Sequence, residues 1–223
     1  MSILSEAWAI IPAFASNDSW EINQALRTQG AWVFGSILLL LGSMFVLWLY
    51  KRVPLLDKHL ERTIMVYSYL LIAAIIFVEV FRRFAMNQQV PWSTTVPPLL
   101  FMIMAWYGCA YNVRLRTHLS FAEFRTMMPR LGQMITLALD AVLWFGFCVI
   151  VFTATMRVTA LSATNFQIVS GTDNVMLWWF LVTIPVAFVL MSARVLENLL
   201  EDIARYKSGE PLIKQAIIGE EPA

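Results

Sequence analysis

The chain is poor in charge and in cysteine. Only 14% of its 223 residues are Asp, Glu, Lys or Arg, whereas an average soluble domain has about 25%. The net charge of +1 creates no field that would attract nucleic acid. Cys109 and Cys148 both lie inside apolar runs, which argues against a disulfide framework or a cysteine-ligated zinc site. These shortages exclude a disordered chain, a nucleic-acid-binding protein and an ordinary water-soluble enzyme.

Catalytic motifs are missing as well. The sequence has no Walker loop, no GxSxG elbow, no HExxH pair and no CxxC pair. Its two histidines, His59 and His118, lie in basic segments near predicted helix ends, whereas a bis-histidine haem needs two imidazoles that face each other. We therefore expect neither an enzyme nor a bound cofactor, although a quinone site remains open as an alternative.

Apolar residues are abundant, at 59% of the chain. A helix needs about 20 mainly apolar residues to cross the hydrocarbon core of a bilayer. Five segments meet this requirement and predict an all-α integral membrane bundle with five transmembrane helices: Gly30–Tyr50, Thr63–Phe81, Val96–Val113, Met134–Met156 and Met176–Ala193.

The positions of lysine and arginine indicate the orientation. In chain order, the segments between the predicted spans hold 1, 4, 2, 4, 1 and 4 of these residues, so alternate segments hold 12 against 4. Positive residues accumulate in cytoplasmic segments. The sequence therefore predicts a periplasmic N-terminus and a cytoplasmic C-terminus.

Two acids lie within or at the end of the spans. Asp140 is about two turns into the fourth span, at a depth of roughly 9 Å. We favour a hydrogen bond from a neighbouring helix or partner subunit over an ion or proton site there. Glu79 precedes Arg82 and Arg83 by three and four residues, the spacing of an ion pair on one helix face. We interpret this group as an interfacial anchor, with a role in anionic-substrate passage as the alternative.

The two ends of the chain are expected to lie outside the membrane. Apolar residues recur at helical spacing near the N-terminus, so residues 1–28 are predicted to form a periplasmic surface segment. Leucines recur in the same way after the last span, and residues 194–223 are predicted to be a cytoplasmic amphipathic tail. The Ser208-Gly209 pair marks the end of its helix.

The middle of the sequence resembles a known family. The segment Glu79-Val-Phe-Arg82-Arg83-Phe-Ala-Met-Asn87 is followed by Trp92 and by Gly108-Cys-Ala-Tyr-Asn-Val-Arg114-Leu-Arg116-Thr-His118. This succession is similar to the small membrane subunit, or Q subunit, of TRAP (tripartite ATP-independent periplasmic) transporters. In that family a helix ends in a valine-and-arginine element, a short loop carries a tryptophan, and the next helix closes with glycine, small residues, a basic pair and a histidine.

The resemblance covers about residues 63–193 and implies a four-helix Q-like core. Residues 29–62 are then an additional N-terminal transmembrane helix with its cytoplasmic loop. The sequence departs from the family pattern at Thr95, where an acid commonly follows the loop tryptophan by three residues. It departs again at Leu115, which splits the basic pair.

The resemblance also implies a function. Q subunits are similar to static braces for a large multi-span M subunit, which carries sodium and substrate by an elevator-type mechanism. A periplasmic substrate-binding protein, the P subunit, delivers an organic acid or a similar small solute to the outer face of the pair. The chain is therefore expected to be a scaffold subunit of a sodium-coupled secondary importer in the bacterial inner membrane.

Eight residues are candidates for contacts with these partners or with membrane lipids. They are Arg82, Arg83, Trp92, Gly108, Arg114, Arg116, His118 and Asp140. Two other functions remain open: a membrane anchor of a redox enzyme with a quinone or haem site, and a self-sufficient channel or carrier.

Overall fold

A computed structural model of the chain describes residues 3–116 and 125–212. Five of its helical stretches are long and apolar enough to cross a membrane, so the predicted all-α membrane bundle is confirmed. Within the described residues the only extended pairing is a single antiparallel bridge between Ile168 and Met176. The elements are α1 (Ile3–Ser16), α2 (Ser19–Ala25), α3 (Gly30–Arg52), α4 (Pro54–Ala85), the 3-10 helix η1 (Pro91–Thr94), α5 (Val96–Leu115), α7 (Arg130–Thr164), α8 (Trp178–Leu181) and α9 (Thr183–Ser208).

Several helices extend beyond the predicted spans. α4 starts at Pro54, where proline suits a first helical turn, and its first two turns carry Asp57 and Glu61. α9 passes without a break through the boundary placed between residues 193 and 194, so the start of the predicted tail continues the last span. The helix ends at Gly209, which adopts the left-handed conformation (φ 87°) that terminates helices.

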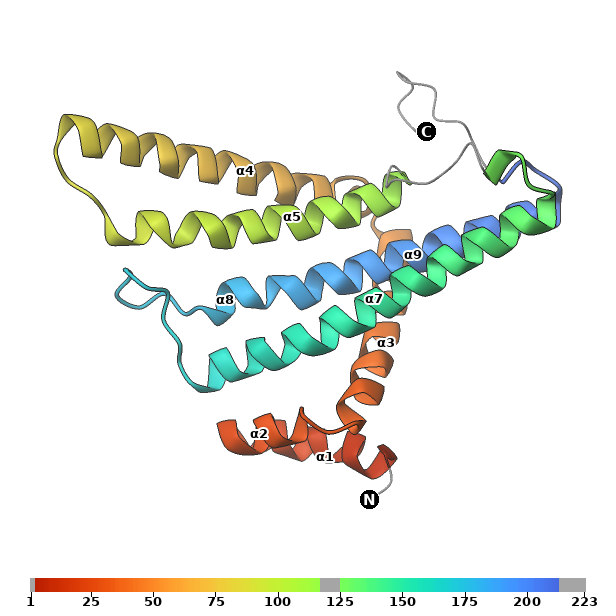
Figure 1. The fold of residues 1–223 in the computed structure, drawn as a ribbon, viewed down its shortest axis with the longest axis horizontal. Coiled ribbons are helices and arrows are strands. Elements are labelled where there is room, and N and C mark those ends of the chain that lie inside the picture. Colours follow the sequence, from red (N-terminus) through yellow and green to blue (C-terminus); the bar gives the residue numbers. More distant parts are fainter. Residues whose placement is uncertain (1–2, 117–124, 213–223) are drawn as a thin grey trace.

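The four helices of the predicted core form two antiparallel hairpins that lie side by side (Figure 1). α4 packs against α5, α7 packs against α9, and contacts between α5 and α9 join the hairpins. Phe188 of α9 is fully buried in the main apolar core, with the rings of Trp106 and Phe147 at 4.9 and 5.7 Å from its own. Such aromatic contacts add to the packing that holds helices together in lipid.

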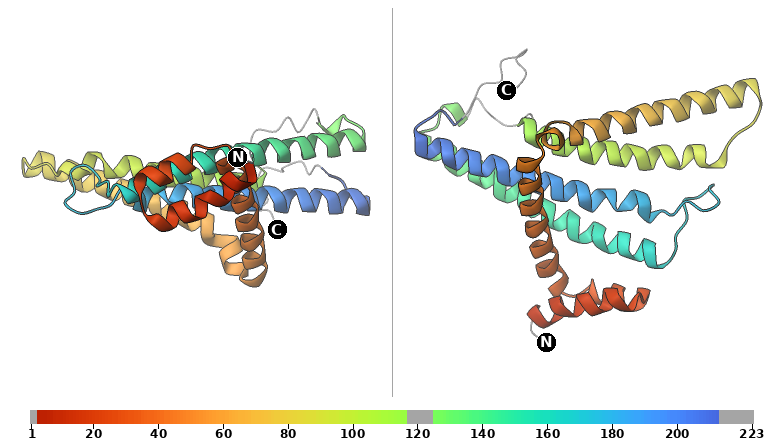
Figure 2. Two further views of the ribbon diagram at one scale, coloured as in Figure 1. Left: turned by 90° about the horizontal axis from the view of Figure 1, so that it is seen from below. Right: turned by 180° about the vertical axis from the view of Figure 1, so that it is seen from behind.

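α3 crosses the other long helices obliquely instead of running alongside them (Figures 1 and 2). Its residues meet three neighbours in turn: Gly35 faces Thr153 of α7, Gly42 faces Val189 of α9, and Tyr50 reaches α4. A Cβ atom at Gly35 would lie 2.4 Å from the Thr153 hydroxyl oxygen, so this approach of the two helices requires glycine. α3 therefore connects three of the four core helices.

The N-terminal helices pack on the start of α3 and on α7. Glu6 of α1 accepts a hydrogen bond from Gly30 N at 3.2 Å, which satisfies a backbone donor at the first turn of α3. Asn23 of α2 accepts a hydrogen bond from Arg157 Nη2 of α7 at 2.9 Å. The segment expected at the periplasmic surface thus lies against the C-terminal part of α7.

Candidate functional site

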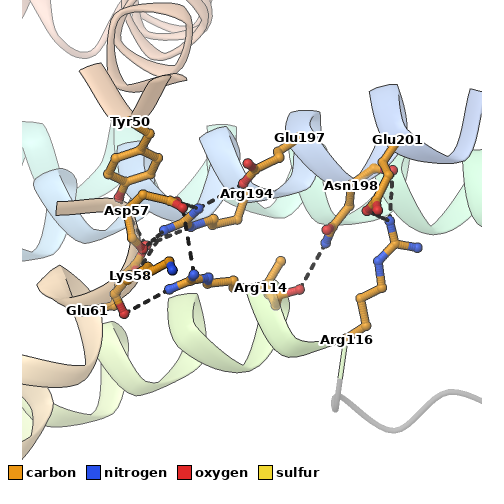
Figure 3. A network of polar contacts seen from close by, with 11 residues as sticks. Tyr50, Asp57, Lys58, Glu61, Arg114, Arg116, Arg194, Glu197, Asn198 and Glu201 are labelled. Carbon is orange, nitrogen blue, oxygen red and sulfur yellow. Dashed lines mark hydrogen bonds and ion pairs between the residues drawn. The ribbon is translucent and has the colours of Figure 1, made fainter. Parts of the chain in front are cut away.

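A buried group of charged residues lies where α3, α4 and α9 meet (Figure 3). Arg194 of α9 is 1% exposed and donates hydrogen bonds to both carboxylate oxygens of Glu61 on α4, at 2.8 and 3.1 Å. It also donates to Asp57 at 2.5 Å and to Glu197 at 2.8 Å. The hydroxyl of Tyr50 donates to Glu61 at 3.0 Å, and the Tyr50 ring lies 4.1 Å from the Arg194 guanidinium carbon. We call these five residues the Arg194 network.

Helical spacing brings the members of the Arg194 network together. Asp57 and Glu61 are four residues apart on α4, and Arg194 and Glu197 are three apart on α9, so each pair shares a helix face. An unpaired buried charge costs several kcal/mol. The bidentate pairing with Glu61 and the two further carboxylates satisfy the guanidinium instead. The members belong to two predicted segments, residues 29–62 and 194–223, so their pairing could not be read from the sequence.

The two arginines at the end of α5 are paired inside the chain. Arg114 Nη1 donates to the carbonyl oxygen of Lys58 at 3.1 Å (Figure 3). Arg116 donates to Asp202 of α9 at 2.6 Å. Both side chains thus hold α5 to a neighbouring helix, and their contact with a partner or with lipid stays a prediction. His118, the next candidate, lies outside the described residues.

Asp140 and Gly108 also face other parts of the chain. Asp140 forms an ion pair with Arg125, which precedes α7 in sequence. The Asp140 carboxylate therefore has a positively charged partner within the chain. Gly108 faces α4, where a Cβ atom would lie 3.3 Å from the Met65 sulfur. In residues 3–116 and 125–212, no three His, Cys, Asp or Glu side chains are placed to hold a metal ion.

The arginines at the other end of α4 are arranged differently from what their spacing predicted. Glu79 does not form an ion pair with Arg82 or Arg83; its Oε1 atom accepts a hydrogen bond from Val90 N at 3.2 Å. Leaving a backbone N–H without a hydrogen bond destabilises a fold by more than an exposed ion pair stabilises it. The Glu79 carboxylate therefore bonds to Val90 N and not to an arginine. Arg82 Nε is buried without a hydrogen-bond partner in the described part of the chain, and the Arg83 side chain is exposed.

Trp92 and Thr95 lie where the two loops at this end of the bundle meet. The hydroxyl of Thr95 donates to the carbonyl oxygen of Ser170 at 2.7 Å. Gly171 (φ 82°) approaches Pro91 so closely that a Cβ atom would lie 2.6 Å from the Pro91 carbonyl carbon. Trp92 belongs to η1 beside this contact and is 36% exposed. The threonine that replaces the acid of the family pattern therefore joins the two hairpins.

More than half of the chain matches a known protein family. Residues 72–205 match the family model described as Tripartite ATP-independent periplasmic transporters, DctQ component. The matched region begins within α4 and ends within α9. It contains α5, α7 and α8 in full, and it leaves α1, α2, α3 and residues 54–71 of α4 outside. No curated protein matches the chain.

Proposed function

Because the chain belongs to the DctQ family of tripartite ATP-independent periplasmic transporters, we propose that it is the small scaffold subunit of a sodium-coupled secondary importer. In this proposal the chain is not an enzyme. It braces a large elevator-type M subunit, which carries sodium and an organic acid or similar small solute.

The pairing of charged side chains inside the bundle supports this proposal. Arg194 is held by Glu61, and Arg116 is held by Asp202, so these cations link helices and do not line an open path. A carrier for a charged solute needs polar groups that face a water-filled cavity within the membrane. Helices fixed to one another by buried ion pairs suit a static body beside which a moving domain slides.

We also propose an orientation in the bacterial inner membrane. The end of the bundle that carries the Arg194 network faces the cytoplasm, because the segments at this end hold most of the lysines and arginines. The Thr95–Ser170 contact then lies at the periplasmic end. The loops joined there are available to help present the outer face of the complex to the P subunit.

The test is purification of the tagged chain in a mild detergent, with identification of the proteins that accompany it. The proposal expects a large multi-span protein in equal amount. It also expects sodium-dependent uptake into liposomes only when both membrane subunits and the binding protein are present. Uptake by the isolated chain would contradict the scaffold role, and a Soret band or bound quinone would favour a redox anchor.

A further inference from the structure

We propose that Arg82 and Arg83 form a binding site for the phosphate group of an anionic phospholipid at the end of α4. This end lies at the upper left in Figure 1, next to the loop that leads to α5. The inference depends on α4 crossing the membrane and on its side chains. It does not depend on the proposed scaffold function.

Arg82 and Arg83 carry positive charge that no carboxylate of the described residues neutralises. At the opposite end of the bundle, Arg116 and Arg194 are each held by carboxylates. At this end, Glu79 is engaged by Val90 N, and neither Arg82 nor Arg83 has an ion-pair partner among the described residues. A cation in apolar surroundings is stabilised by an anion at close range. Arg83 therefore offers an unneutralised guanidinium group at the helix surface, and Arg82, on a neighbouring face of the same turn, adds positive charge beside it.

The length of α4 places Arg82 and Arg83 at the depth of lipid headgroups. Arg62 and Arg82 lie 20 residues apart on one continuous helix, which is about 30 Å at the rise of an α-helix. This length equals the hydrocarbon thickness of a typical bilayer, about 30 Å. The residues between them carry a single charged side chain, that of Glu79. With Arg62 among the headgroups of one leaflet, Arg82 and Arg83 lie among the headgroups of the other.

The side chains around Arg83 combine hydrogen-bond donors with an apolar surface. A shallow hollow beside the helix end is lined by Arg83, Phe84, Asn87, Gln88 and Gln89. Guanidinium groups bind phosphate with paired hydrogen bonds, and amide groups add further donors. Phe84 is 80% exposed and offers an apolar surface beside these donors. A phosphate with an acyl chain next to it satisfies both kinds of group.

A lipid fits this site better than an acidic protein that docks from the periplasm. Arg82 and Arg83 lie in the last turn of α4, before the loop of residues 86–95. A protein that approaches along the membrane normal meets that loop first. The Arg82 Nε atom is enclosed by the chain, which leaves less of this side chain open to a protein docking on the loop. A lipid headgroup, in contrast, lies at the depth of the last turn of α4.

The experiment measures binding of phosphatidylglycerol to the purified full chain in detergent by native mass spectrometry. The Arg82→Gln/Arg83→Gln variant should bind about thirtyfold more weakly, given the contribution of a basic residue near an anionic lipid. The matched control is Lys51→Gln/Arg52→Gln, an adjacent basic pair on α3. It loses the same charge, but neither residue lines the hollow and Arg52 lies over the Trp48 ring, so this variant should weaken binding clearly less than Arg82→Gln/Arg83→Gln. If the Arg82→Gln/Arg83→Gln variant bound phosphatidylglycerol as tightly as the Lys51→Gln/Arg52→Gln control, the proposal would be overturned.

Two competitors distinguish the sources of the anion. Zwitterionic phosphatidylcholine and about 10 mM inorganic phosphate should both leave phosphatidylglycerol bound, because a charged headgroup with its acyl chains gives the site its selectivity. Displacement by inorganic phosphate would assign the site to free phosphate and overturn the lipid proposal. The lipid proposal would also be overturned if a periplasmic binding protein displaced phosphatidylglycerol from the chain and no longer bound the Arg82→Gln/Arg83→Gln variant.

A photoreactive phosphatidylglycerol provides a test on the unmodified chain, which does not rely on folding of a variant. The proposal expects its crosslinks to concentrate on residues 80–90. Crosslinks spread evenly over the exposed apolar surface, or absent from this segment, would contradict it.

Discussion

Arg194 is the centre of the charged network at the end of the bundle where α3, α4 and α9 meet. Its guanidinium group is 1% exposed, and three carboxylates from two helices surround it. Glu61, which is 0% exposed, has Arg194 as its ion-pair partner and Tyr50 as a second hydrogen-bond donor. Replacing Arg194 and replacing Glu61 therefore leave different amounts of buried charge without a partner. The two replacements should lower the free energy of unfolding by different amounts.

Arg194→Met should lower the free energy of unfolding by about 3–5 kcal/mol, because it leaves Glu61 buried without a cation. Glu61→Gln should cost less, since Asp57 and Glu197 still neutralise Arg194. The measurement is denaturant unfolding of each variant in the same detergent. Glu201→Gln serves as the control, because its side chain is 47% exposed and its pairs should contribute about 1 kcal/mol or less. Equal losses for all three variants would show that the network does not stabilise the fold.

The sequence identified several polar residues of the site but not their partners. Arg114 and Arg116 stand out because they follow a long apolar run, and Asp140 stands out because it interrupts one. Their partners Lys58, Asp202 and Arg125 are distant in sequence or in an unremarkable segment. Which charges meet is decided by how the helices pack, and hydropathy contains no information on that packing.

At the scale of the helix, the close crossing of α3 and α7 is the feature most easily tested. Gly35→Ala should destabilise the chain by about 1–3 kcal/mol, the usual effect of overpacking, because the new Cβ atom would meet the Thr153 hydroxyl at 2.4 Å. At Gly146 on α7, no atom of the described residues lies within 4 Å of the position that a Cβ atom would take. Gly146→Ala should therefore be neutral or stabilising by up to about 1 kcal/mol.

A double-mutant cycle shows whether the Gly35 effect arises at this contact. Thr153→Ala removes the atoms nearest to the new Cβ, so Gly35→Ala should cost much less in that background. Unfolding in detergent gives all four stabilities. If the changes in unfolding free energy caused by Gly35→Ala and Thr153→Ala simply add, the contact with Thr153 is not the reason that alanine at position 35 destabilises the chain.

The oblique course of α3 over α9 makes a second prediction at this scale. Ser43 and Ser192 hydroxyl oxygens lie 2.5 Å apart, so Ser43→Cys/Ser192→Cys should form a disulfide on mild oxidation. The native Cys109 and Cys148 are first replaced by alanine. Ser36→Cys/Ser192→Cys is the control, because Ser36 lies two helical turns from Ser43 and its hydroxyl bonds to Trp32 O. Mobility on a non-reducing gel reports the bond, and crosslinking of the control pair alone would contradict the crossing.

The helices themselves could largely be predicted from the sequence, but the angles at which they cross one another could not. The apolar runs gave the five spans, since lipid requires long apolar helices. The helix α4 begins nine residues before the predicted Thr63–Phe81 span. Its added turns carry Asp57 and Glu61, charged residues in a stretch expected to be a loop, and both pair with Arg194. Small residues at Gly35 and Gly42 indicated close packing, but their spacing does not say that α3 lies across its neighbours.

At the scale of the whole molecule, the bundle has two chemically different ends. One end holds ion pairs between helices: that of Arg194 with Glu61 is buried, and that of Arg116 with Asp202 is partly buried. The other end is joined by neutral contacts such as that of Thr95 with Ser170, and its arginines on α4 are unpaired among the described residues. This asymmetry follows the distribution of positive charge along the sequence and makes the orientation in the membrane the decisive property to measure.

Single cysteines placed on the chain lacking Cys109 and Cys148 test that orientation. Gln88→Cys, in the loop between α4 and η1, should react with a membrane-impermeant thiol reagent in cells whose outer membrane alone is permeabilised. Lys207→Cys, at the end of α9, should react only after the inner membrane is opened, because positive segments are retained in the cytoplasm. Ser16→Cys, at the end of α1, should behave like Gln88→Cys if α3 crosses from the outer to the inner side. If Ser16→Cys, like Lys207→Cys, reacts only after the inner membrane is opened, both ends of the chain lie in the cytoplasm. In that case α3 lies across the bundle without crossing the bilayer, and four helices span it.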